Sequence, residues 1–162
     1  MRANSPLLIA LVILAIAAMS IAGAFIFEAL GFAPCELCLK ERIPYFAAIP
    51  IAALAALFAA RGYKKLLGAA FAGLALIFLA SAGFGAYHAG VEWGFWPGPT
   101  ECSGVLVRAP TVGEFLSQLQ NAKVVRCDAP SLRIIGLSLA GWNAVISAGL
   151  AIAAAIGFAK KI

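Results

Sequence analysis

The chain alternates between long apolar stretches and shorter polar segments. The apolar stretches cover residues 7–27, 43–60, 66–87 and 134–159, and none of them contains Asp, Glu, Lys or Arg. A helix that crosses a bilayer needs about 20 consecutive, mostly apolar residues. Transmembrane strands would instead alternate apolar and polar positions, and these runs are continuous. The pattern therefore predicts four membrane-spanning helices.

The composition leads to the same fold class. Hydrophobic residues make up 64% of the 162 residues and charged residues 12%, against about 45–50% and about 25% in soluble domains. A soluble domain of this size could not bury so much apolar surface. Alanine and glycine are frequent in the apolar runs, and small side chains let helices approach closely in lipid. We expect an all-α membrane protein, a four-transmembrane-helix bundle in which residues 1–162 form a single domain.

The basic residues predict how the helices are oriented. Six of the 12 Lys and Arg residues lie in the two terminal segments and in residues 61–65, where there is no Asp or Glu. Cytoplasmic loops carry an excess of Lys and Arg, so these segments are expected in the cytoplasm. The loops over residues 28–42 and 88–133 then lie on the opposite side. We interpret the net charge of +5 as a signal of topology and expect no nucleic-acid partner.

The first apolar run has a second interpretation. Arg2, the run itself and Ala22-Gly23-Ala24 are similar to a secretory signal peptide with its cleavage site. The run is longer than the 7–15 apolar residues usual in a signal peptide. We therefore expect it to remain as the first span.

All four cysteines fall in the two loops assigned to the far side. Cys35 and Cys38 form a C-x-x-C motif in the first loop, and Cys102 and Cys127 lie in the second. Outside the cytoplasm four cysteines indicate disulfides, with three pairings available. The loop lengths favour Cys35–Cys38 and Cys102–Cys127 in the resting protein. The position of the four cysteines would also fit two purely structural disulfides. A C-x-x-C disulfide, however, closes a very small ring and stabilises a protein little, so this motif favours redox or metal chemistry.

The surroundings of the motif favour redox chemistry. The motif runs directly into the second apolar span, and a helix N-terminus lowers the pKa of a cysteine. Cys38 and Arg42 are four residues apart, so in a helix the guanidinium can approach the sulfur. An ordinary anchoring role at the membrane interface is the alternative for Arg42. We expect Glu41 to be a solvated partner of Lys40 or Arg42.

The segment C-E-L-C-L-K-E-R at residues 35–42 resembles the C-x-L-C-x-x-E-R motif of the DsbB family. Residues 87–99 and 136–143 are also similar to the family, whereas Leu132 stands where relatives often carry Trp. The resemblance implies a multi-pass protein of the bacterial inner membrane, with both termini cytoplasmic and the cysteine loops periplasmic. It also implies the activity: reoxidation of the periplasmic thioredoxin-fold oxidase DsbA, with electrons passed to the membrane pool of quinone, either ubiquinone or menaquinone.

The resemblance further implies roles for individual residues. All four cysteines are implied to be catalytic, with Cys102 forming the mixed disulfide with the partner. The released pair exchanges with the C-x-x-C motif through Cys35. Cys38 is implied to face the quinone as a thiolate, Arg42 to support quinone binding, and His88 to lie near the quinone. A histidine at the interface without a role in quinone binding is the alternative for His88, and no metal site is expected.

Three smaller predictions concern other positions. Asn143 is polar within a span and is predicted to join helices. The three tryptophans are predicted to form an interfacial aromatic belt, and Trp142 could also line a quinone pocket. Thr111 and Glu114 form a capping box, which predicts a short helix in the second loop lying in the membrane interface.

Other classes of protein fit the sequence less well. A metal-binding membrane protein could use all four thiolates, but zinc sites usually offer closely spaced pairs, and Cys102 and Cys127 are far apart. A non-catalytic membrane scaffold with two structural disulfides is a further alternative. The vitamin-K-epoxide-reductase-like family also has a helical bundle with a C-x-x-C motif. In that family the motif comes late in the bundle, whereas here it precedes the second span.

Overall fold

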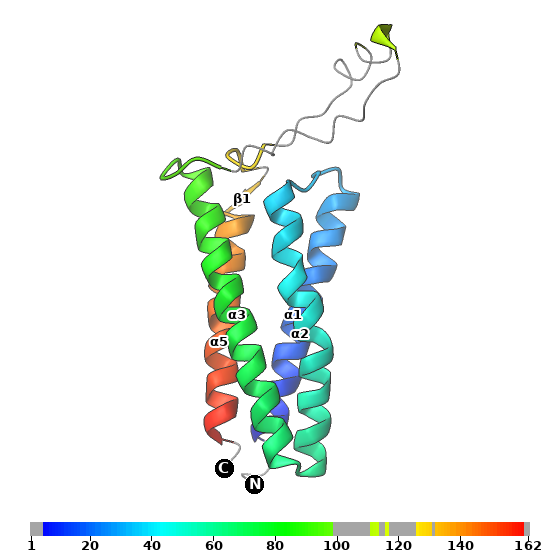
Figure 1. Ribbon diagram of the computed structural model, residues 1–162, viewed down its shortest axis with the longest axis vertical. Coiled ribbons are helices and arrows are strands. Elements are labelled where there is room, and N and C mark those ends of the chain that lie inside the picture. Colours follow the sequence, from blue (N-terminus) through cyan, green and yellow to red (C-terminus); the bar gives the residue numbers. More distant parts are fainter. Residues whose placement is uncertain (1–4, 99–110, 114–115, 117–125, 131, 161–162) are drawn as a thin grey trace.

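The computed structural model shows a bundle of long helices that lie side by side (Figure 1). It describes residues 5–98, 111–113, 116, 126–130 and 132–160. The long helices are α1 (Ser5–Ala29), α2 (Glu36–Arg61), α3 (Lys64–Glu92) and α5 (Leu139–Lys160). Each of these four is long and apolar enough to cross a membrane. The predicted fold class, an all-α membrane protein with four spanning helices, is confirmed.

Two helices extend further toward the cysteine end than the apolar runs predict. Helix α2 begins at Glu36, so most of the predicted loop 28–42 is helical. Helix α3 continues to Glu92, so His88 lies inside α3. The extension of α2 is stabilised locally, because Cys35 caps it and Glu36 forms an ion pair with Lys40 one turn later at 2.6 Å. Apolar runs mark the hydrocarbon core, whereas helices continue into the headgroup region.

The fourth helix begins later than predicted because a hairpin precedes it. Strands β1 (Arg133–Ile134) and β2 (Leu137–Ser138) pair antiparallel. Ile135 and Gly136 between them have φ values of 54° and 80°, as a two-residue type I′ turn requires. The hydroxyl of Ser138 then accepts a hydrogen bond from the Gly141 N–H at 3.2 Å. A serine in this position caps a helix, so α5 begins at Leu139 although the apolar run starts earlier.

Polar side chains join three of the helices in the middle of the bundle. The Tyr45 hydroxyl of α2 donates a hydrogen bond to the side-chain Oδ1 of Asn143 in α5 at 2.7 Å. It also lies 3.0 Å from the Ser147 hydroxyl. Ser147 also contacts Ser81 of α3 at 2.9 Å. Interhelical hydrogen bonds of this kind hold helices together in lipid. The predicted role of Asn143 in joining helices is confirmed.

Helices α3 and α5 approach each other closely at Gly85. A Cβ atom added there would lie 2.9 Å from the backbone nitrogen of Ala144 and 3.2 Å from the carbonyl oxygen of Ala140. Backbone atoms cannot move aside as a side chain can. The absence of a side chain at Gly85 therefore sets the spacing of these two helices beside Asn143.

We expect Gly85→Ala to destabilise the bundle by about 1–3 kcal/mol, the usual cost of overpacking a well-packed core. Gly83→Ala is the matched control, because an added Cβ at Gly83 meets no described atom within 4 Å. Thermal unfolding of the two full-length variants in the same detergent should show a lower midpoint for Gly85→Ala alone. Equal midpoints would contradict the proposed close contact.

Candidate active site

The C-x-x-C motif forms the N-terminus of α2 at the end of the bundle opposite to the turn between α2 and α3 (Figure 1). Cys35 is the N-cap residue, with an extended backbone, and its sulfur accepts a hydrogen bond from the Cys38 N–H at 3.2 Å. The two sulfurs are 2.6 Å apart. Both residues are free thiols, so the structure holds this pair as a dithiol instead of the predicted resting disulfide.

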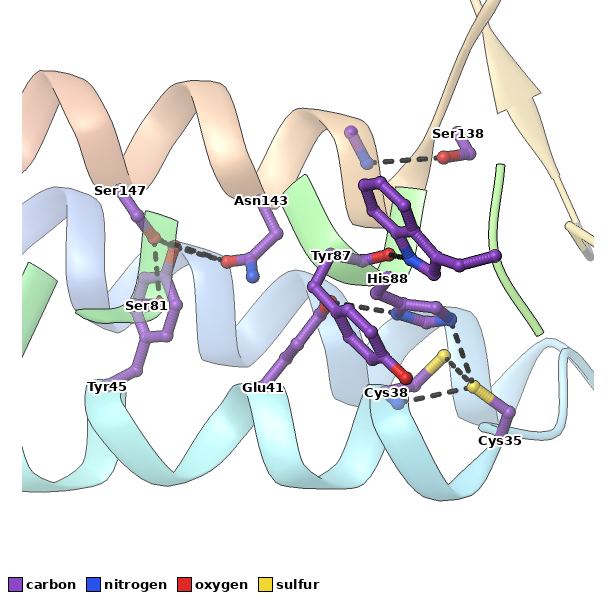
Figure 2. Close-up of polar contacts among 12 residues, drawn as sticks. Cys35, Cys38, Glu41, Tyr45, Ser81, Tyr87, His88, Ser138, Asn143 and Ser147 are labelled. Atoms are coloured by element: carbon purple, nitrogen blue, oxygen red, sulfur yellow. Dashed lines mark hydrogen bonds and ion pairs between the residues drawn. The ribbon is translucent and has the colours of Figure 1, made fainter. Parts of the chain in front are cut away.

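His88 reaches the motif from the neighbouring helix α3. Its Nε2 lies 3.6 Å from the Cys35 sulfur, and its Nδ1 lies 2.8 Å from the Glu41 carboxylate. Figure 2 shows this path from Cys35 through the imidazole to Glu41. His88 is 1% exposed and Glu41 is 9% exposed. A buried carboxylate and a buried imidazole thus stand beside the reactive sulfur.

The prediction that Glu41 is a solvated partner of Lys40 or Arg42 is wrong. Because α2 begins at Glu36, Glu41 lies on the same face as Leu37 and Tyr45, which are buried in the bundle. The spacing of four residues places all three on one side of a helix. Once the start of the helix is known, this periodicity identifies Glu41 as an inward-facing residue.

The surroundings of Cys35 favour its thiolate form. Contact with the Cys38 thiol lowers the pKa of Cys35 most, burial opposes this, and His88 and the N–H of Cys38 lower it further. Cys35 stands at the helix N-terminus, where unpaired N–H groups favour a negative charge. Low pKa is a mark of a reactive cysteine, and here it falls on the first cysteine of the motif.

Arg42 does not bond to the Cys38 sulfur as the spacing suggested. Its guanidinium donates to the Glu28 carboxylate at 2.8 Å and lies 5.1 Å from the centre of the Phe25 ring. Glu28 and Phe25 belong to α1. A full carboxylate charge within hydrogen-bond distance is a stronger partner for a guanidinium than a partly buried thiol.

A cavity of about 390 Å³ lies between α1, α2 and α5 below the motif. This volume is within the range of small-molecule sites, about 300–1,000 Å³. Most of its lining is apolar, and it includes Trp142 as well as the following polar or reactive side chains: Ser20, Cys38, Glu41, Arg42, Tyr45 and Asn143. Among the described residues, Cys38 lines this cavity and Cys35 and His88 do not.

The second cysteine pair is described in part. Cys127 is disulfide-bonded, and it is buried in one cluster with Cys35 and Leu37, against which Cys38 packs. Its predicted partner Cys102 lies outside the described residues, as does Glu114 of the predicted loop helix. A disulfide at Cys127 is not available as a thiolate, which contradicts the alternative of a four-cysteine metal site.

The ligand atoms of Cys35, Cys38 and His88 lie within 4.8 Å of one another, which raises the question of a metal. Two thiolates bound to one zinc ion at about 2.3 Å each in tetrahedral geometry stand about 3.8 Å apart. The two sulfurs here are much closer, at 2.6 Å, which is too short for two ligands of one zinc ion. The cluster therefore has the geometry of a dithiol beside a base, and we do not assign it as a metal site.

The comparisons with known proteins agree with this chemistry. The model of the family described as disulfide bond formation protein DsbB matches residues 6–157. An uncharacterized protein of Rickettsia prowazekii (strain Madrid E) is 27% identical over 142 residues, which cover 85% of this chain and 78% of that protein. No solved structure matches the chain. Because the family model spans nearly the whole chain, with all four cysteines and all four spanning helices, this protein belongs to the DsbB family of membrane proteins of disulfide bond formation.

Proposed function

We propose that the protein is a quinone-dependent protein-disulfide oxidoreductase that reoxidises a DsbA-like periplasmic oxidase. The observation that carries the proposal is the position of the dithiol between two different surroundings. Cys35 is buried in one cluster with disulfide-bonded Cys127, whereas Cys38 lines the apolar cavity. A cysteine pair in this position can receive electrons from a second disulfide on one side and deliver them to a ligand on the other.

The cavity fits a quinone ring. Apolar side chains form most of its wall, and Arg42, Tyr45 and Asn143 provide polar groups suited to the two ring carbonyls. The Asn143 amide nitrogen is buried, and the Asn143 amide interacts with the Glu41 carboxylate, which also lines the cavity. When bound, a quinone accepts two electrons and two protons. Ubiquinone is a benzoquinone and menaquinone a naphthoquinone, and both carry the two opposed carbonyl groups that these contacts would recognise.

The order of exchange follows from thiol chemistry. Cys102 accepts electrons from the reduced partner through a mixed disulfide, and the reduced Cys102–Cys127 pair then attacks Cys35. The Cys38 thiolate that leaves takes up the proton of the attacking thiol. The second thiol of the pair then displaces Cys35, so that the Cys102–Cys127 bond forms again and Cys35 and Cys38 are left as a dithiol. Cys38 gives up the electrons at the wall of the cavity as the Cys35–Cys38 bond forms again. Each exchange breaks one S–S bond and makes another, so the two electrons are conserved until they leave through Cys38.

Energetics explain why a quinone is needed. DsbA has a reduction potential of about −120 mV, and an ordinary disulfide has one of about −270 mV. Oxidation of reduced DsbA by such a disulfide would be unfavourable by about 150 mV, or about 7 kcal/mol. An ordinary disulfide could not reoxidise such a partner. A strongly oxidising ligand that withdraws electrons from Cys38 makes the overall reaction favourable.

We further propose that the protein lies in the bacterial inner membrane with its termini in the cytoplasm and its cysteines in the periplasm. The distribution of basic residues supports this orientation. The beginning of α1, the end of α5 and the turn between α2 and α3 also lie at one end of the bundle, and the dithiol lies at the other (Figure 1).

The experiment is an assay of the full-length protein in lipid nanodiscs with reduced DsbA and a short-chain ubiquinone or menaquinone. Loss of quinone absorbance and loss of DsbA thiols are recorded together. We expect one quinone to be reduced for every two thiols lost, and no reaction after the four cysteines have been reduced and alkylated. Thiol loss that does not depend on quinone, or no reduction of either quinone, would refute the proposal.

A further inference from the structure

Cys35 is connected to the cavity by a chain of polar contacts that does not pass through Cys38. The Cys35 sulfur lies 3.6 Å from Nε2 of His88, and Nδ1 of His88 lies 2.8 Å from Glu41. Glu41 lines the cavity. Figure 2 shows these side chains in sequence, with the imidazole between the sulfur and the carboxylate. The contacts thus cross from α2 to α3 and return to α2 one turn below the motif.

Oxidation of a dithiol releases two electrons and two protons. Cys38 lies on the cavity wall, so its own proton can leave there. Cys35 is 5% exposed and is not among the residues that line the cavity. The second proton therefore needs a separate path, and His88 and Glu41 occupy the space where such a path would run.

We propose that His88 and Glu41 form a proton relay from Cys35 to the cavity, an inference that rests on the proposed function. While the pair is reduced, Cys35 is a thiolate and its proton is on Nε2 of His88. Nδ1 of His88 carries a second proton, which faces the Glu41 carboxylate. When the Cys35–Cys38 bond forms, the Nδ1 proton passes to Glu41 and then into the cavity. Two electrons leave through Cys38, and two protons leave, one from the Cys38 thiol and one through Glu41. These are the electrons and protons that a bound quinone would take up.

The thiols of the Cys102–Cys127 pair supply the protons for the next cycle, because exchange between a dithiol and a disulfide transfers two protons together with the two electrons. The Cys35 proton then moves again to His88, and the imidazole again carries protons on both nitrogens. The lowered pKa of Cys35 agrees with a thiolate beside His88. The other titratable groups that face Cys35 are Cys38 on the same helix and Glu92 on α3, while Cys127 is disulfide-bonded and does not titrate.

The test uses the fact that His88 is the one histidine in the chain. Full-length protein with 15N-labelled histidine, in micelles and without quinone, is prepared as dithiol and, with diamide, as disulfide. At neutral pH we expect imidazole shifts of a ring with two N–H groups in the dithiol form and of a ring with one in the disulfide form. The same ring state in both forms would overturn the relay.

Glu41→Gln tests the acceptor, and Glu36→Gln is the matched control. Glu36 carries the same charge next to Cys35 in sequence, but its side chain is partly exposed and pairs with Lys40. We expect Glu41→Gln to abolish the change of ring state and to raise the midpoint of Cys35 alkylation by about one to two pH units, since it removes a charge-assisted hydrogen bond. Glu36→Gln should leave both unchanged. A change of ring state that persists in Glu41→Gln would overturn the role of Glu41.

These measurements are independent of the proposed function. Neither the spectra nor the alkylation midpoints require a quinone, so a protein that reduces no quinone can still show the two ring states. If the assay with DsbA succeeds and the ring state does not change, the relay alone is refuted. If the ring state changes and no quinone is reduced, the proton movement stands and the proposed oxidant is refuted.

Discussion

Cys38→Ser is expected to lose quinone reduction completely, down to the rate of nanodiscs without protein. A serine hydroxyl cannot form a disulfide, and Cys38 is the cysteine on the wall of the cavity. Cys35 cannot take its place, because it is buried with Cys127 on the other side of the motif. The measurement is quinone absorbance after mixing with reduced DsbA.

Cys35→Ser is the control, because it removes the other cysteine of the motif and leaves the Cys38 thiol at the cavity. It should also stop turnover, but it keeps the Cys38 thiol in place. A lipid-soluble maleimide should alkylate Cys38 in Cys35→Ser quickly, and excess quinone should protect it. Quinone reduction by Cys38→Ser, or protection of Cys35 in place of Cys38, would contradict the assignment of Cys38 to the cavity.

The second large effect is expected for Arg42→Gln. Arg42 is one of the cavity residues and offers a positive charge to a ligand that gains negative charge on reduction. Loss of a charge-assisted contact costs about 1.5–3 kcal/mol, so quinone reduction should slow by about 10- to 100-fold. Exchange of thiols with DsbA should keep its rate, because it takes place at the other end of the electron path. Stopped-flow measurement of each half-reaction distinguishes the two.

Glu28→Gln is the matched control for Arg42. It removes the partner of the guanidinium, which lies 2.8 Å away, and leaves the positive charge itself in place. The Glu28 side chain is 43% exposed, and an ion pair with an accessible carboxylate contributes little, about 0–1 kcal/mol. This variant should therefore reduce quinone at no less than about one fifth of the wild-type rate. Equal slowing of both half-reactions in Arg42→Gln would show that Arg42 is an interfacial anchor.

The fold could be predicted because lipid leaves few options for the backbone. Continuous apolar runs without charges must satisfy their hydrogen bonds internally, and helices do so. The ends of the helices could not be predicted in the same way. The hairpin before α5 consists of residues that are almost as apolar as the helix itself, and its turn at Ile135 and Gly136 depends on backbone angles that hydrophobicity does not report.

The candidate site was predictable where its residues are close in sequence. The contact between Cys35 and Cys38 follows from a C-x-x-C motif at a helix N-terminus. Glu41 and His88 are 47 residues apart, and their contact depends on how α2 and α3 are rotated against each other. Ionisable residues within spans usually face the interior of a bundle and mark functional sites. Glu41 and His88 lie just outside the apolar runs, so the sequence pattern did not identify them as residues within a span.

The sulfur of Cys35 also holds the first turn of α2, because it accepts the N–H of Cys38. If Cys35 forms the mixed disulfide of the proposed cycle, its sulfur would turn toward the new partner and the helix would lose this cap. Loss of a cap costs a helix about 1 kcal/mol, enough to fray a terminal turn. The residue at which α2 begins would therefore depend on whether the Cys35 sulfur is free or bonded to another cysteine. Amide hydrogen exchange at Cys38 would then be faster in the mixed disulfide than in the dithiol, and it would report the proposed cycle without any thiol reagent.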